Sequence, residues 1–136
     1  MIDVTPLTKA SERLSEALRE QALEPDRVLL RAGTIQTFEF TYELSFRILK
    51  RYLEANAANP NDIELLTFEG VIRLGDQSGL LLSPVAKWKD FRQARTDTSH
   101  TYNEEKAIKV LARIPDFDKE VKFLLERLRE RSGVRG

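Results

Sequence analysis

The stretch from Arg27 to Ala55 constrains the fold more than any other part of the chain. Its apolar side chains recur at three- and four-residue spacings, which predicts one long helix. These positions form two offset stripes: Ile35, Phe38, Tyr42, Phe46, Leu49 and Leu53, and then Phe40, Leu44, Ile48 and Tyr52. A helix with two apolar faces is either the centre of a bundle or shared between the bundle and a partner chain. Gly33 within this helix predicts close packing or a kink.

Capping residues and helix breakers predict the other helices. The expected ranges are Thr5 to about Ala22, about Asp62 to Leu74, Ser83 to about Ala94, about Glu104 to Arg113, and Asp116 to about Arg131. Thr5 and Ser83 are the expected N-caps of two of these helices, and Gly75 is the expected C-terminal cap of a third. Pro115 is expected to end the helix that starts at Glu104.

A chain of 136 residues is long enough for one domain and too short for two of ordinary size. We therefore expect a single all-α domain, an up-and-down four-helix bundle with additional short helices, whose last residues, 132–136, fray. The sequence shows no leader peptide and no apolar run long enough to cross a membrane. A cytoplasmic protein without membrane contact is the resulting expectation.

The composition narrows the classes of function. Lys plus Arg number 22 and Asp plus Glu also number 22, whereas proteins that bind nucleic acid mainly through charge carry a basic excess. Any RNA contact therefore needs a local patch, and the best candidate is formed by Lys87, Lys89, Arg92 and Arg95. The chain has no cysteine and one histidine, which excludes thiol catalysis and disfavours a metal site. No cofactor is expected.

The only histidine, His100, lies at an expected junction between two helices. Residues 96–99 are poor helix formers whose side chains compete for backbone hydrogen bonds, so the helix should bend or end there. Thr101 or Asn103 is the expected N-cap of the next helix. On a straight helix Arg95 and His100 would point about 140° apart. Only a broken helix or a partner chain therefore brings both side chains to one ligand.

Arginine, histidine and tyrosine together suit phosphate chemistry. Arg95 offers paired donors to an anion, His100 a group that transfers protons near neutral pH, and Tyr102 a hydroxyl. Glu39 and Glu43 lie four residues apart on the long helix, and carboxylates among aromatic side chains are costly to bury unless they are paired. They are candidate partners for Arg95 or His100. The alternatives are a structural ion pair, a capping histidine and a solvated strip of carboxylates.

Two stretches, residues 35–54 and residues 99–104, also resemble a known family. They are similar to the nucleotidyltransferase substrate-binding proteins, the HepT-like members of the HEPN superfamily, and the likeness extends from about Asp26 to Arg113. The resemblance implies an all-α bundle, usually a homodimer, encoded beside a minimal nucleotidyltransferase partner. It joins an aromatic-rich helix to an Arg-x4-His-x-Tyr motif at the expected distance.

The resemblance also assigns roles to residues. It implies that Arg95 and His100 are the catalytic pair of a metal-independent endoribonuclease, part of a toxin-antitoxin-like system, and that the partner attaches AMP to Tyr102. Relatives place Asn, Asp or His directly after the arginine, where this chain has Thr96 followed by Asp97. We therefore keep Asp97, with Glu39 and Glu43, as a supporting or binding residue rather than a catalytic one.

Two alternatives to the ribonuclease remain open from the sequence. One is a non-catalytic subunit that binds a substrate or nucleotide, or regulates its nucleotidyltransferase partner. The neutral net charge and Thr96 favour it. The other is a plain helical dimer in which the motif is structural.

Overall fold

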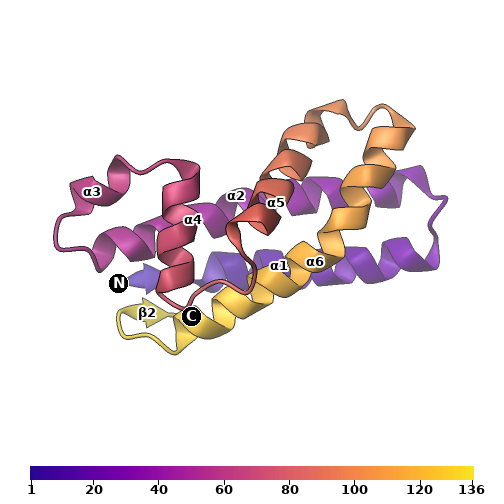
Figure 1. The fold of residues 1–136 in the computed structure, drawn as a ribbon. Coiled ribbons are helices and arrows are strands. Elements are labelled where there is room, and N and C mark those ends of the chain that lie inside the picture. The colour runs from indigo at the N-terminus through magenta and orange to yellow at the C-terminus, as the bar shows by residue number, and fades with distance from the viewer.

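The computed structural model describes residues 1–136. Its elements are, in order, β1 (Ile2–Asp3), α1 (Thr5–Leu23), α2 (Val28–Ala55), α3 (Pro60–Glu64), α4 (Phe68–Gln77), α5 (Val85–Asp97), the short 3-10 helix η1 (Thr98–His100), α6 (Glu104–Arg129) and β2 (Val134–Arg135). The helices α1, α2 and α6 pack against one another along the length of the molecule, while α5 lies against α2 and α6 (Figure 1). The predicted all-α bundle with additional short helices is confirmed. None of these helices is long and apolar enough to span a membrane.

The helix α2 is the central element, as its two apolar stripes predicted. Every member of the first stripe is buried except the partly buried Phe46, and Leu44, Ile48 and Tyr52 bury the second stripe. Phe40 is the exception, because 58% of it is exposed. Close packing at Gly33 is not observed, because a Cβ added there would have no neighbour within 4 Å.

An aromatic cluster sets the position of α5 against α2 and α6. The ring of Phe117 in α6 lies 5.2 Å from Phe38 and 5.3 Å from Phe91 between centroids, both in edge-to-face geometry. Trp88 contacts Phe91 in the same way at 5.5 Å. These four rings are fully buried, and such pairs add favourable energy beyond the area they bury. Because these contacts fix the inner face of α5, the side chain of Arg95, two turns after Trp88, faces α2 and reaches Glu43.

Pro115 does not end a helix. It lies inside α6, which runs unbroken from Glu104 to Arg129, so the two helices expected there are one. Proline removes one backbone hydrogen bond and crowds the preceding turn, at a cost of about 3 kcal/mol. Ile114 and Phe117 on either side are fully buried, and that burial offsets the cost. Figure 1 shows that α6 bends along its length, as expected of a helix that contains proline.

The helix expected from Asp62 to Leu74 is two helices, α3 and α4, separated at residues 65–67. Thr67 causes the restart, because its hydroxyl accepts a hydrogen bond from the Gly70 N–H at 3.1 Å. Gly75 is not a cap but an interior residue of α4. A Cβ there would lie 3.2 Å from Leu49 of α2, so its role is to let α4 approach α2.

The C-terminal residues expected to fray instead pair with the N-terminus. Strand β2 lies parallel to β1, with Ile2 N–H donating to the Gly133 carbonyl at 2.7 Å.

The expected caps also differ: Val4 and Pro84, rather than Thr5 and Ser83, occupy the N-cap positions of α1 and α5. Val4 is fully buried, and burial of this residue holds the N-terminal segment where β2 can pair with it.

Candidate functional site

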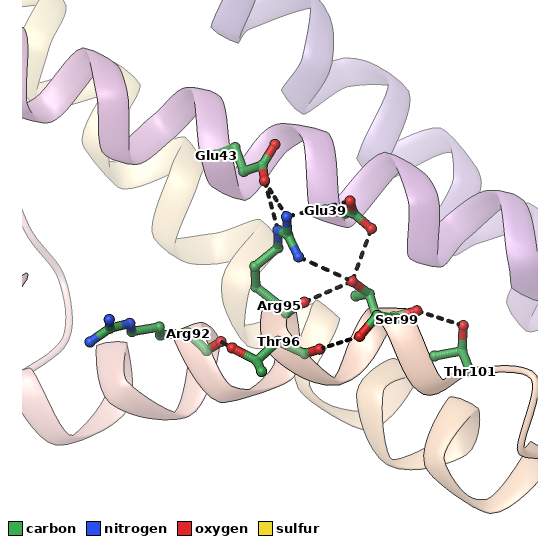
Figure 2. Close-up of polar contacts among 8 residues, drawn as sticks. Glu39, Glu43, Arg92, Arg95, Thr96, Ser99 and Thr101 are labelled. Carbon is green, nitrogen blue, oxygen red and sulfur yellow. Dashed lines mark hydrogen bonds and ion pairs between the residues drawn. The ribbon is translucent and has the colours of Figure 1, made fainter.

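The break between α5 and α6 lies where the run of poor helix formers predicted it. Thr96, Ser99 and Thr101 each donate a side-chain hydroxyl to a backbone carbonyl three or four residues earlier, at 3.0 to 3.1 Å (Figure 2). Such bonds compete with regular helical ones. Of the two candidate caps, Asn103 is the one used, because its side chain accepts from the Lys106 N–H at 3.2 Å.

Arg95 is held by the two carboxylates of α2. Glu43 Oε1 accepts hydrogen bonds from both Arg95 Nε, at 2.9 Å, and Arg95 Nη2. Glu39 Oε1 lies 3.6 Å from the same Nη2. Figure 2 shows the guanidinium between the two acidic side chains. Of the alternatives open from the sequence, pairing of Glu39 and Glu43 with Arg95 is the arrangement in the structure.

Thr98 completes this cluster, and sequence reasoning did not single it out. Its buried hydroxyl lies 2.9 Å from Glu39 Oε2 and 2.7 Å from the Arg95 carbonyl, and it accepts from Arg95 Nη1 at 3.5 Å. A hydroxyl has one proton, so it donates to one of these acceptors at a time. The available signal was its position three residues after Arg95, which places both side chains on one helical face.

The charges of this cluster do not balance. Two carboxylates surround one guanidinium, and most of the donors of Arg95 already point at Glu43, Glu39 and Thr98. All three charged side chains are 30% to 44% exposed, so solvent weakens their attraction. A phosphate that binds at Arg95 must therefore displace a carboxylate or wait for the cluster to rearrange.

His100 and Tyr102 form a separate, exposed pair. Their ring centroids are 6.4 Å apart at an interplanar angle of 74°, and 88% of Tyr102 is exposed. No hydrogen bond or ion pair within the chain joins either ring to Arg95, Glu39 or Glu43. The structure thus brings the carboxylates to Arg95 and places the imidazole and the phenol together on the surface beyond it.

Asp97 belongs to neither group. Its carboxylate accepts from Gln93 Nε2 at 3.0 Å and lies 3.9 Å from Arg113 Nη1 of α6. Arg113 also contacts Asp90 at 3.0 Å. Asp97 therefore helps to attach the end of α5 to α6. No three His, Cys, Asp or Glu residues gather in a way that would hold a metal ion.

The basic patch expected on α5 is largely neutralised. Lys87 pairs with Asp116 at 2.6 Å and Lys89 pairs with Glu69 at 2.5 Å. The hydrogen bond and charge of Asp116 raise the pKa of Lys87. Arg92 instead lies over the Phe68 ring, 4.7 Å from its centroid, and forms no ion pair.

A cavity of about 520 Å³ opens beside Arg95 between α2, α4 and α5. Its lining includes Phe46, Lys50, Phe68, Arg92, Arg95 and Thr96. Tyr42 also lines it, and burial raises the pKa of this phenol to about 12. The Tyr42 hydroxyl therefore stays protonated at neutral pH. Sequence reasoning missed the cavity because its walls come from three helices.

The sequence matches, over residues 2–130, a family described as nucleotidyltransferase substrate binding protein like. The chain belongs to this family. The family assigned from the two sequence motifs is thus confirmed.

Relatives and solved structures agree with this family. A Haemophilus influenzae protein named probable ribonuclease HepT is 47% identical over 101 residues, which cover 74% of this chain and 68% of the relative. A solved structure from the same organism, described as the fold of a substrate binding domain of a nucleotidyltransferase, superposes with a TM-score of 0.86 at 37% identity, covering 93% of this chain and 98% of that one. A Thermus thermophilus structure gives a TM-score of 0.75 at 32% identity, covering 90% and 98%.

Proposed function

We propose that this family member is the HEPN-type subunit of a two-component system with a minimal nucleotidyltransferase, and that it is a metal-independent endoribonuclease. The observation that carries the proposal is the break between α5 and α6. It leaves His100 in solvent five residues after an arginine that α2 holds in place. The relative named probable ribonuclease HepT supports the same activity.

In this mechanism His100 acts as the general base. Its imidazole takes the proton from an RNA 2′-hydroxyl, whose oxygen attacks the adjacent phosphorus and displaces the 5′-oxygen of the next nucleotide. The products are a 2′,3′-cyclic phosphate and a 5′-hydroxyl, once the leaving oxygen is protonated by water, Tyr102 or a second subunit. Arg95 stabilises the charge that develops on the phosphate oxygens.

A second subunit fits the state of Arg95. Two carboxylates neutralise it within one chain, and Phe40, next to Glu39 in the sequence, leaves an aromatic side chain 58% exposed on α2. Aromatic side chains are enriched in protein–protein interfaces. We propose a homodimer in which contact through α2 or α5 rearranges the carboxylates and frees donors of Arg95.

Tyr102 is the proposed site of inhibition by the partner. With 88% of the residue exposed, its hydroxyl is open to an enzyme that transfers AMP from ATP and releases pyrophosphate. The ring lies 6.4 Å from that of His100. An added AMP would place bulk and negative charge beside the general base and repel the phosphates of RNA. We place both proteins in the cytoplasm.

The competing function is a non-catalytic subunit that binds a substrate or nucleotide for the nucleotidyltransferase, or regulates it. The pairing of Arg95 with Glu43 and Glu39 favours this function, because it occupies the donors that an anionic transition state needs. A neutral net charge also favours it.

One experiment separates the two. RNA cleavage is measured for the purified protein, for His100→Ala and for Ser99→Ala as the exposed neighbouring control, and intact mass is measured with and without the co-expressed partner. We expect cleavage that needs His100, and a mass gain of AMP units that Tyr102→Phe abolishes. Intact RNA with every protein would contradict the ribonuclease and support the binding subunit.

A further inference from the structure

The cavity between α2, α4 and α5 contains aromatic and cationic residues that, apart from Arg95, have no part in the proposed mechanism. It combines three aromatic side chains, Tyr42, Phe46 and Phe68, with three cations, Lys50, Arg92 and Arg95, and one carboxylate, Glu43. The groove between α1 and α6 is larger, about 670 Å³, but it lacks both the aromatic residues and the excess of cations. It contains no aromatic residue, and its three cations face three carboxylates: Arg19, Lys122 and Arg129 against Glu12, Glu126 and Glu130.

Two cations of the cavity are free to bind an anion. Lys50 and Arg92 have no ion pair and no side-chain hydrogen bond within the chain, whereas Arg95 is occupied by Glu43. A cation–π contact places the Arg92 guanidinium at the cavity wall, with its central carbon 4.7 Å from the centroid of the Phe68 ring. A guanidinium offers paired N–H donors, which suit phosphate. The site of anion binding indicated by the charges is therefore Arg92 with Lys50.

The two phenyl rings supply a surface for a planar ligand. The centroids of Phe46 and Phe68 are 5.4 Å apart at 31°, and both side chains are only partly buried. Aromatic faces bind nucleobases by stacking, with little preference among bases. A cavity of about 520 Å³ falls within the range of roughly 300–1,000 Å³ typical of small-molecule sites.

A second depression continues the surface along α5. It has a volume of about 380 Å³, is lined by Lys89, Arg92, Gln93 and Thr96, and shares Arg92 and Thr96 with the cavity. A single nucleotide needs only one of these depressions. Their continuity favours a ligand with successive phosphates, which a single RNA strand has.

From these observations we propose that the cavity between α2, α4 and α5 binds one nucleotide of a single-stranded RNA, with its phosphate at Arg92 and Lys50 and its base against Phe46 and Phe68. This inference rests on the proposed function in that the bound strand would lead past Arg95 to the scissile phosphate. It differs from that function in the residues it assigns, none of which is Arg95, His100 or Tyr102.

Binding of an uncleavable strand tests the inference without any need for cleavage. A fluorescently labelled oligonucleotide with every 2′-hydroxyl methylated is titrated with the full chain, and anisotropy gives the Kd. We expect Arg92→Ala and Lys50→Ala each to raise the Kd about five- to tenfold and to lower the slope of log K against log salt by about one unit, as loss of one phosphate contact does. Phe68→Leu, which keeps apolar bulk, should raise the Kd about fivefold.

Arg47→Ala is the matched control. It removes the same unit of charge from an exposed position one turn before Lys50 on α2, outside the cavity. We expect Arg47→Ala to change the Kd less than twofold. Equal weakening by Arg47→Ala and Lys50→Ala would show attraction without a site and would overturn the proposal, as would cavity variants that bind like wild type.

Two further measurements identify the ligand and separate the two proposals. AMP, added as a competitor, should displace the strand only at concentrations far above those of an unlabelled strand; tight binding of AMP alone would replace RNA by a free nucleotide as the occupant. Cleavage of unmodified RNA is measured with the same cavity variants. If RNA is never cleaved but the cavity variants still lose binding, the ribonuclease fails and the nucleotide site stands.

Discussion

Arg95 and His100 are five residues apart in the sequence, yet they lie in opposite environments. Arg95 projects from a regular helix into a cluster with Glu39, Glu43 and Thr98. His100 ends a short 3-10 helix, is exposed, and contacts only Tyr102 among the motif residues. One short motif thus has an anchored half, Arg95, whose position is set by side chains of the bundle. Its exposed half, His100 and Tyr102, is open to a substrate or partner.

The strongest test of this contrast is His100→Ala. Loss of a general base lowers rates by about 100- to 10,000-fold, so under the proposed mechanism RNA cleavage should fall by at least 100-fold. Because His100 is exposed and has no hydrogen-bond partner on its side chain, the melting temperature should stay within about one degree of wild type. A variant that is both inactive and markedly less stable would show that His100 belongs to the anchored half.

Thr98→Val should have the largest effect on stability within the motif. It keeps the shape of a residue that is 8% exposed but removes the hydroxyl that bridges Glu39 and Arg95. Loss of the hydroxyl leaves Glu39 without this hydrogen-bond partner, which should lower the free energy of unfolding by about 1–3 kcal/mol, as measured with urea. Thr96→Val is the control, since Thr96 is exposed, and we expect a change below about 0.5 kcal/mol.

Arg95→Ala should cost less, about 1 kcal/mol or below, because the ion pairs of Arg95 are partly exposed and screened. The double variant with Glu43→Gln should recover part of this loss, since it also removes the repulsion between Glu39 and Glu43. A double-mutant cycle on urea unfolding measures the coupling. Zero coupling would mean that the cluster does not anchor Arg95.

The smallest effect concerns the other end of α5, where Glu120 of α6 accepts a hydrogen bond from the Leu82 N–H at 2.8 Å. Burial raises the pKa of Glu120 above its ordinary value of 4.5, against the effect of hydrogen bonds from Ser83 and Leu82. Because its folded-state pKa is raised, Glu120 contributes fully to the free energy of unfolding below pH 4.5, and this contribution is lost as pH rises through the folded-state pKa. The stability of Glu120→Gln should therefore depend less on pH in that window, as measured by unfolding at a series of pH values. An unchanged pH profile would exclude Glu120 as its source.

The long central helix and the junction after α5 were readable from local sequence. The spacing of apolar residues predicted a helix from about Arg27 to Ala55, and α2 runs from Val28 to Ala55. The polar run at residues 96–99 marked the end of α5, because side chains that compete for backbone hydrogen bonds act within a few residues. The pairing of Arg95 with Glu39 and Glu43 was one of several alternatives that the sequence left open. It could not be chosen, because Glu43 and Arg95 are 52 residues apart in the chain.

The sequence by itself determined that this protein is a helical bundle of the nucleotidyltransferase substrate-binding family, with an arginine and a histidine on either side of a helix break. Tertiary structure decided the rest. Packing around Ile114 and Phe117 carried α6 through Pro115, and the closed bundle brought the two chain ends together as β1 and β2. The cavity beside Arg95 likewise exists only once α2, α4 and α5 are assembled. The physical reason is the distance along the chain over which each effect acts. Helix caps and apolar periodicity depend on neighbouring residues, whereas burial and ion pairs join side chains that are far apart in the sequence.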